Sequence, residues 1–312
     1  MSDKSPMPKR VGDFLRPFRR GVAFILGKWK EFISSLFLGG EFAIIAVEET
    51  MKFCAIASGS SGNCQYIETN EKKILIDAGL SGKAIEENLR AVGVDPGDLD
   101  GIFVTHEHND HVKGVGILAR RWGLDVFANE NTWHAMEKTV KRIDDHKRHV
   151  FDTAQAFSYG DMEIVPMALF HDAAEGTGFV ICSGSKKISV LTDTGWVNTS
   201  MLEKMSGSDL YYIESNHDSD MLESGPYPRI LKDRIASTRG HLSNEHCGEL
   251  LTGLLEKKGE HVVLAHLSEE NNRPLLAARA TREILAEHAI YEGRDFILEV
   301  AKAKLPSRFI EL

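Results

Sequence analysis

Short apolar runs alternate with helical patterns along most of the chain. The runs are bounded by Gly, Ser, Asn or Lys, which is typical of buried strands. Between them, apolar side chains recur every three or four residues, the spacing of one helix face. Ser243 precedes one such segment and is expected to cap a helix, and Pro228 is expected to open another. Strands are predicted at residues 53–57, 66–67, 74–76, 102–104, 125–128, 162–168, 179–183, 188–192, 211–213, 261–264 and 296–300, and helices at 81–92, 112–122, 131–142, 199–205, 228–236, 243–255 and 274–288.

This order of elements favours an α/β fold. Strand-rich halves with helices between them predict two sheets packed face to face, with the helices on the outer faces. No Pro/Gly/Ser linker or repeat period interrupts the pattern. We therefore expect one domain at residues 51–312.

Residues 1–50 are expected to be an N-terminal extension, peripheral or disordered. Residues 1–40 carry eight Lys and Arg against three carboxylates, with apolar residues at helical spacing. One interpretation is a basic amphipathic helix on a membrane surface. The other, which we favour, is a tail outside the fold, since Met51 would be a natural start with the first strand following at once.

Composition narrows the class of protein. With 42% hydrophobic and 27% charged residues, the chain is typical of a globular protein, and not of a disordered or membrane-spanning one. A net charge of −9 argues against a protein that coats nucleic acid or membranes with its whole surface, although it permits a local basic groove. The four cysteines form no C-x-x-C pair, which favours a reducing compartment and hence the cytoplasm.

The sharpest chemical signal is the run His106-x-His108-x-Asp110-His111. Imidazoles two residues apart at the end of a strand point the same way and can hold one metal ion. Asp110 and His111 begin the next turn and can face a second ion. Imidazole with carboxylate suits Zn, Mn or Fe better than Ca or Mg.

Three more candidate ligands follow predicted strands further along the chain: His171, Asp193 and His266. A lone His or Asp at a strand end is usually only solvated. Their recurrence downstream of a metal motif favours ligation, with the two oxygens of Asp193 able to bridge two ions.

These residues resemble, in order, the five metal motifs of the metallo-β-lactamase superfamily. The resemblance covers residues 51 to about 301 and implies a four-layer αββα sandwich. Within the superfamily, ASGSSGN at 57–63, TDTG at 192–195, ESNHD at 214–218, GHLS at 240–243 and AHLS at 265–268 resemble the YycJ/WalJ group. That group is regarded as exonucleases acting 5′ to 3′ on duplex DNA. Residues 240–243 and 266–268 also resemble the paired His motifs of ribonuclease Z.

The resemblance implies a role for each candidate ligand. It places His106, His108 and His171 on the first ion, Asp110, His111 and His266 on the second, and Asp193 on both. Every ligand position holds the expected residue type, which argues against a degenerate, non-catalytic member. The cofactors expected are two divalent ions, with Zn preferred and Mn or Fe as alternatives.

Other residues are candidates for the chemistry itself. Asp110 is expected to accept a proton from the attacking water, and His241 to contact a phosphate oxygen or help the leaving oxygen depart. Asp77, at the end of a strand, either orients a ligating imidazole or caps a turn.

Substrate contacts are less sharply indicated. The stripe Arg229, Lys232, Arg234 and Arg239 either contacts a nucleic-acid backbone or is a solvated helix face. The loop at 58–63 offers hydroxyls and backbone N–H groups to a phosphate. His217 is either a substrate contact or a core residue. The candidate substrate-binding residues are Ser58, Ser60, Ser61, Asn63, His217 and Arg239.

We therefore expect a dinuclear-metal phosphodiesterase, specifically a 5′-to-3′ exonuclease acting on DNA. The alternative is a hydrolase of a small ester, thioester or lactam on the same scaffold; a third is a non-catalytic or membrane-tethered scaffold. Nucleic acid, and specifically DNA, is the expected partner, and no obligate protein partner is indicated.

Overall fold

The computed structural model describes residues 50–312, which form one compact unit. The predicted extension at residues 1–50 lies outside this range except for Thr50. Its boundary and the membrane-surface alternative therefore stay predictions. Within residues 50–312, no helix is long and apolar enough to cross a membrane.

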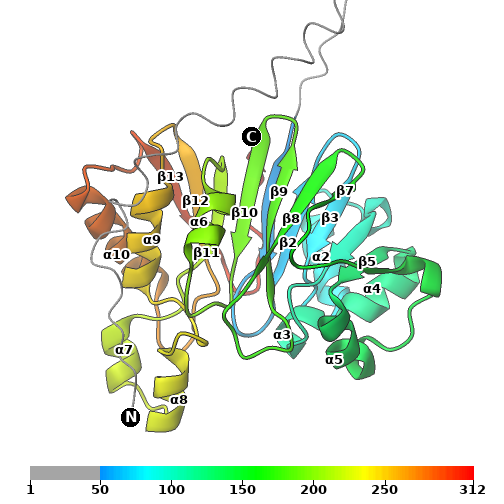
Figure 1. The fold of residues 1–312 in the computed structure, drawn as a ribbon, viewed down its shortest axis with the longest axis horizontal. Helices are drawn as coiled ribbons and strands as arrows, with labels where there is room; N and C mark the ends of the chain where they lie inside the picture. Colours follow the sequence, from blue (N-terminus) through cyan, green and yellow to red (C-terminus); the bar gives the residue numbers. More distant parts are fainter. Residues whose placement is uncertain (1–49) are drawn as a thin grey trace, which may run out of the picture. The chain divides into compact units, whose positions relative to one another are not determined.

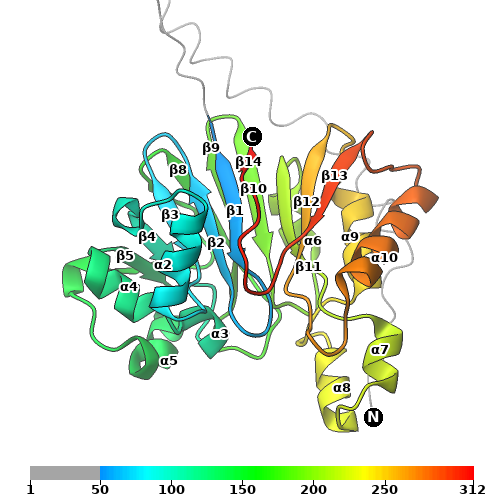
Figure 2. The ribbon, with the colours of Figure 1, turned by 180° about the vertical axis from the view of Figure 1, so that it is seen from behind.

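Two seven-stranded mixed sheets lie face to face, with helices on both outer faces (Figures 1 and 2). The first sheet has the order β14-β1-β2-β3-β4-β5-β6 and the second the order β13-β12-β11-β10-β9-β8-β7. The strands of the first sheet are β1 (Lys52–Ala57), β2 (Cys64–Glu68), β3 (Lys73–Ile76), β4 (Gly101–Phe103), β5 (Asp125–Ala128), β6 (Arg148–Val150) and β14 (Ile310–Glu311). Those of the second are β7 (Phe157–Tyr159), β8 (Met162–Ala168), β9 (Thr177–Ser183), β10 (Lys186–Leu191), β11 (Leu210–Glu214), β12 (Glu260–Ala265) and β13 (Phe296–Val300).

The helices divide between the two outer faces and the rim. Helices α2 (Gly82–Ala91), α4 (Val115–Trp122) and α5 (Glu130–Val140) cover the first sheet, and α6 (Thr199–Met205), α9 (Asn244–Leu254) and α10 (Pro274–Glu287) cover the second. Helices α3 (Asn109–Val112), α7 (Ser219–Ser224) and α8 (Arg229–Ile235) lie at the rim (Figure 1). Two short 3₁₀ turns, Pro96–Asp98 and Asp145–Lys147, complete the list.

Three apolar layers hold these elements together. The layer between the sheets includes Phe53 and Phe103 from the first sheet and Phe179 and Tyr212 from the second. The other two layers lie between each sheet and its helices. This arrangement confirms the predicted αββα sandwich, in which the free energy of folding comes mainly from burying both faces of each sheet.

The cap predicted at Ser243 is confirmed, and one predicted helix is interrupted. Ser81 accepts a hydrogen bond from the N–H of Ala84, and Ser243 from that of His246. The single helix expected at 112–122 is instead two, α3 and α4. They are interrupted where Gly114 donates its N–H to the carbonyl of Ala78 at 2.7 Å. A Cβ on Gly114 would lie 2.6 Å from a backbone oxygen, so only glycine allows this close approach.

Candidate metal centre and active site

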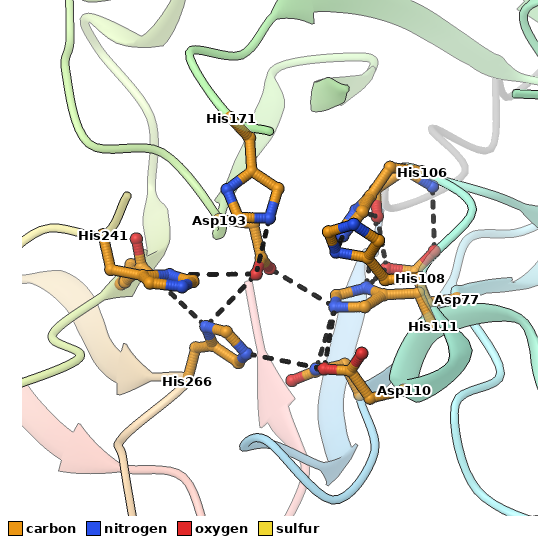
Figure 3. Close-up of polar contacts among 12 residues, drawn as sticks. Asp77, His106, His108, Asp110, His111, His171, Asp193, His241 and His266 are labelled. Carbon is orange, nitrogen blue, oxygen red and sulfur yellow. Dashed lines mark hydrogen bonds and ion pairs between the residues drawn. The ribbon is translucent and has the colours of Figure 1, made fainter. Parts of the chain in front are cut away.

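The candidate ligands gather at one edge of the sandwich, where strands end and loops begin (Figure 3). His106 and His108 follow β4, while Asp110 and His111 lie in α3. His171, Asp193 and His266 follow β8, β10 and β12. Because β10, β11 and β12 run parallel, their carboxyl ends meet at the same edge of the second sheet. The tertiary structure thus brings together all seven ligands predicted from the sequence.

Among residues 50–312, four sets of side chains have ligand atoms close enough to hold one ion, and two of these sets share no residue. The ligand atoms of His106, His108 and His171 lie within 4.8 Å of one another, with Nε2 of His106 3.1 Å from Nδ1 of His108. Those of Asp110, His111 and His266 form a second group within the same limit. These are the two sets that the superfamily resemblance implies.

Asp193 lies between the two groups. Its Oδ1 is 3.8 Å from Nε2 of His171, and its Oδ2 is 3.4 Å from Nε2 of His111. Its Oδ1 is also 3.5 Å from Nδ1 of His266. A carboxylate held this way is suited to bridge two ions.

Unpaired buried atoms fit a bound metal. Oδ2 of Asp193 and Nε2 of His266 are buried and form no hydrogen bond within residues 50–312. Leaving a buried polar atom unpaired costs about 1–3 kcal/mol, so such atoms are rare without a ligand. Both face the candidate centre, and the nitrogen and oxygen donors suit Zn, Mn or Fe. The residues present therefore fit divalent metal ions.

The remaining ring nitrogens of three ligands are fixed by hydrogen bonds. His111 donates from Nδ1 to Oδ2 of Asp77 at 2.7 Å, a contact that favours the orienting role of Asp77 over the turn cap. His171 donates from Nδ1 to the carbonyl of Gly240, and His266 from Nδ1 to Oε1 of Glu214. In each ring the other nitrogen, Nε2, faces the candidate centre, although Nε2 of His111 also lies 3.1 Å from the Asn63 amide nitrogen.

Three of these residues have a left-handed backbone, which is strained for residues other than glycine. Asp77, Asp193 and His266 have φ of 60°, 58° and 54°, and each lies at or just past a strand end. Such a conformation costs of the order of 1 kcal/mol and persists where surrounding contacts enforce it. The sharp turns direct these side chains inward at the sheet edge.

Glu214 is a site residue that the sequence analysis did not single out. It is fully buried at the end of β11, and its Oε1 accepts hydrogen bonds from Nδ1 of His241 at 2.8 Å and of His266 at 2.7 Å. The available signals were its place in the ESNHD motif at 214–218 and its position after the apolar run 210–213, between the strands that Asp193 and His266 follow. Glu214 therefore couples His241 to a candidate ligand.

Burial and charge set the protonation of this cluster. Burial lowers the pKa of His106 well below its ordinary value, which favours the neutral, ligating imidazole. Burial also opposes the charged form of His241, but the Glu214 carboxylate outweighs it and raises the pKa of His241. For Glu214, burial is outweighed in turn by His241 and His266, which hold its pKa below the usual range.

Two residues of the loop at 58–63 contact residues of the candidate centre. Ser58 is buried, and its Oγ accepts hydrogen bonds from the His266 N–H at 2.8 Å and from Tyr212 Oη at 2.7 Å. The buried Asn63 amide lies 3.4 Å from Oδ2 of Asp110. These contacts favour positioning roles for Ser58 and Asn63. Ser60 is exposed, and Ser61 is half-buried.

The other two candidate substrate contacts differ in exposure. His217 is 3% exposed, and its carbonyl accepts the N–H of Asn244, so burial favours the core alternative. Burial also lowers the pKa of His217 to about 4, so the ring is neutral at pH 7. Arg239 is exposed and donates from Nη2 to the carbonyl of His171 at 3.0 Å, which places its charge beside the centre.

Replacing Asp77 by Asn is expected to weaken metal binding about 10- to 100-fold. Asn tolerates the left-handed backbone at this position, but it removes the charge that fixes the His111 tautomer. Competition with a chromophoric chelator measures the affinity, and the melting temperature of the metal-free variant reports on the fold. Asp77 also accepts the N–H of Thr105 at 2.8 Å. If the melting temperature falls while the metal affinity stays unchanged, Asp77 serves only to hold the Thr105 backbone.

Comparison with known proteins places this centre in a family. The model of the metallo-beta-lactamase superfamily matches residues 57–266. The chain is 39% identical to the exodeoxyribonuclease YycJ of Bacillus anthracis over 83% of this chain and 98% of that protein. It is 43% identical to the exodeoxyribonuclease WalJ of Streptococcus pneumoniae over 78% of this chain and 92% of that protein. The metallo-beta-lactamase fold protein YhfI of Bacillus subtilis superposes with a TM-score of 0.65 at 18% identity, covering 83% of this chain and 99% of that one, and supports the fold alone. The chain is therefore a member of the metallo-β-lactamase superfamily, a metal-dependent hydrolase of the YycJ/WalJ type.

Proposed function

We propose that this protein is a dinuclear-metal exonuclease that hydrolyses DNA phosphodiester bonds in the 5′-to-3′ direction. The observation that carries the proposal is Asp193, whose two oxygens face two separate ligand groups. The similarity to two exodeoxyribonucleases, each over most of its length, supports DNA as the substrate. A location in the cytoplasm is also proposed, since the four cysteines are free.

His106, His108, His171 and Asp193 would hold the first ion, and Asp110, His111, His266 and Asp193 the second. Two such ions activate water as a nucleophile and polarise the phosphoryl group. Asp110, with its side chain 28% exposed, is accessible enough to take a proton from the attacking water. Zn is the metal we expect, with Mn or Fe as alternatives.

His241 is proposed to act on the phosphate. Because its Nδ1 is held by Glu214, Nε2 is the free edge of the ring, and the side chain is 20% exposed. A hydrogen bond from this edge to a phosphate or leaving oxygen would stabilise charge that develops in the transition state. Arg239, which lies against His171, adds a positive charge at the same rim.

The test is turnover of three labelled substrates by the purified protein: duplex DNA, RNA and a thioester. Duplexes labelled separately at the 5′ and 3′ ends report direction, since a 5′-to-3′ enzyme releases the 5′ label first as mononucleotide. We expect DNA to be degraded much faster than RNA or the thioester. A preference for the thioester would contradict the proposal and support a hydrolase of small substrates. Early release of the 3′ label would show that the enzyme degrades DNA from the 3′ end instead.

A further inference from the structure

Helices α7 and α8 form a projection beside the centre, at residues 218–236. The chain enters it shortly after Glu214 and leaves it shortly before His241, so both ends are tied to the active site. Figures 1 and 2 show both helices beyond the ends of the second sheet rather than packed on its face. The projection therefore extends the surface of the site away from the sandwich.

Helix α8 is held by little apolar packing. None of its residues is buried, and Ile230 is 85% exposed. A helix with few apolar contacts contributes little to the stability of the core. Arg229, Ile230, Asp233 and Arg234 are exposed and available for contacts with a ligand, while Leu231, Lys232 and Ile235 are half-buried.

The surface of α8 is rich in cations, on a chain with a net charge of −9. Residues 229–239 contain four cations and one carboxylate. Arg229 pairs with Glu223 and Asp233, while Lys232 donates to the carbonyl of Glu223. The Arg229 side chain is 68% exposed, and exposed ion pairs contribute only about 0–1 kcal/mol. A phosphate that contacts Arg229 would displace Glu223 and Asp233 from these weakly stabilising pairs.

Several contacts connect α8 to the centre. The carbonyl of Ile235, the last residue of the helix, accepts the N–H of His241 at 2.9 Å. Arg234 donates from Nε to Oδ2 of Asp172 at 2.6 Å, and Asp172 directly follows His171. Cationic side chains thus extend from the outer end of α8 to the wall of the metal centre.

From this geometry we propose that the exposed face of α8 is the docking surface for the phosphate backbone of the DNA next to the scissile bond. The seven residues of α8 span about 10 Å, roughly the rise of three base pairs. The surface would therefore bind phosphates beyond the reacting one, which a mononucleotide substrate lacks. This inference rests on the proposed exonuclease function.

The test compares an α8 variant, Arg229→Gln with Lys232→Gln, with a matched control. Arg234 is left unchanged because it contacts Asp172 beside a candidate ligand. The control is Arg279→Gln with Arg282→Gln on α10, which removes two exposed, ion-paired cations from another surface. Each protein is assayed on a duplex of about 30 base pairs, between about 50 and 200 mM salt, and on a 4-nitrophenyl ester of thymidine 5′-monophosphate.

For the α8 variant, kcat/KM on the duplex is expected to fall about 10-fold at the lower salt concentration, mainly through KM. Its salt dependence should weaken by about one unit of slope for each lost phosphate contact. Hydrolysis of the mononucleotide ester should match wild type, and the control variant should match wild type on both substrates.

Two outcomes would overturn the inference, and they are distinguishable. If wild type degrades the duplex and the α8 variant has the same KM and salt slope, the docking surface is wrong while the exonuclease function stands. If wild type does not degrade the duplex at all, both proposals fall together. An equal loss on both substrates would show that α8 only supports the centre, and would also contradict the docking role.

Discussion

Replacing His108 by Ala is expected to remove much of the bound metal and to lower DNA hydrolysis by about 10³-fold or more. The wild-type protein should bind close to two transition-metal ions per chain. His108 supplies one of the three imidazoles of the first group, and its Nδ1 lies 3.1 Å from Nε2 of His106. Losing the charge stabilisation of one ion removes several kcal/mol from the transition state, and each 1.36 kcal/mol corresponds to about tenfold in rate.

Metal analysis by mass spectrometry, together with turnover on labelled duplex, measures this effect. The matched control is His146→Ala, which removes an exposed histidine from the short 3₁₀ turn at Asp145–Lys147. The control should retain metal and activity. Retention of both ions and full activity by the His108 variant would disprove the ligand assignment.

Replacing His241 by Ala is expected to lower DNA turnover by about 10²- to 10³-fold while leaving the metals in place. In the proposed scheme His241 is not a ligand, and Glu214 can still hold Nδ1 of His266 when His241 is absent. A small activated ester has a leaving group that needs no assistance, so its hydrolysis should fall much less. The two substrates therefore separate a role on the phosphate from a general role in holding the centre together.

The measurement requires turnover on both substrates at verified equal metal content, together with the melting temperature. An equal loss on both substrates, with a lower melting temperature, would mean that His241 supports local structure only. Loss of metal would instead place His241 among the ligands. This is a real alternative geometrically, because His241, Glu214, Asp193 and His266 also have ligand atoms within 4.8 Å of one another.

Features that depend on neighbours in sequence were predictable from the sequence. The cap at Ser243 is local, because its side chain accepts an N–H three residues on. The metal motif from His106 to His111 is also one short continuous stretch, so its metal-binding chemistry can be recognised in the sequence. The four-layer fold followed from the order of strands and helices together with the superfamily resemblance.

Features that depend on contacts between distant segments could not be predicted in this way. Strand β14 pairs with β1 across most of the described chain, and its two residues carry no periodicity. The break at Gly114 arises because the Ala78 carbonyl, from another loop, needs its N–H. The local sequence pattern shows neither the strand that β14 pairs with nor the carbonyl that Gly114 contacts.

The sequence by itself determined which residues can bind metal and in what order they occur, because ligand chemistry belongs to the side chain. Only the tertiary structure decided which of these residues form each ligand group and which contacts hold them in place. Asp193, at the end of β10, faces both ligand groups because the packing of the two sheets brings the segment after β4 and helix α3 against the carboxyl ends of β10 to β12. Glu214 joins His241 to His266 although 27 and 52 residues separate it from them. The physical reason is that a hydrogen bond depends on distances of about 3 Å between atoms, and these are set by the packing of the sheets rather than by separation along the chain.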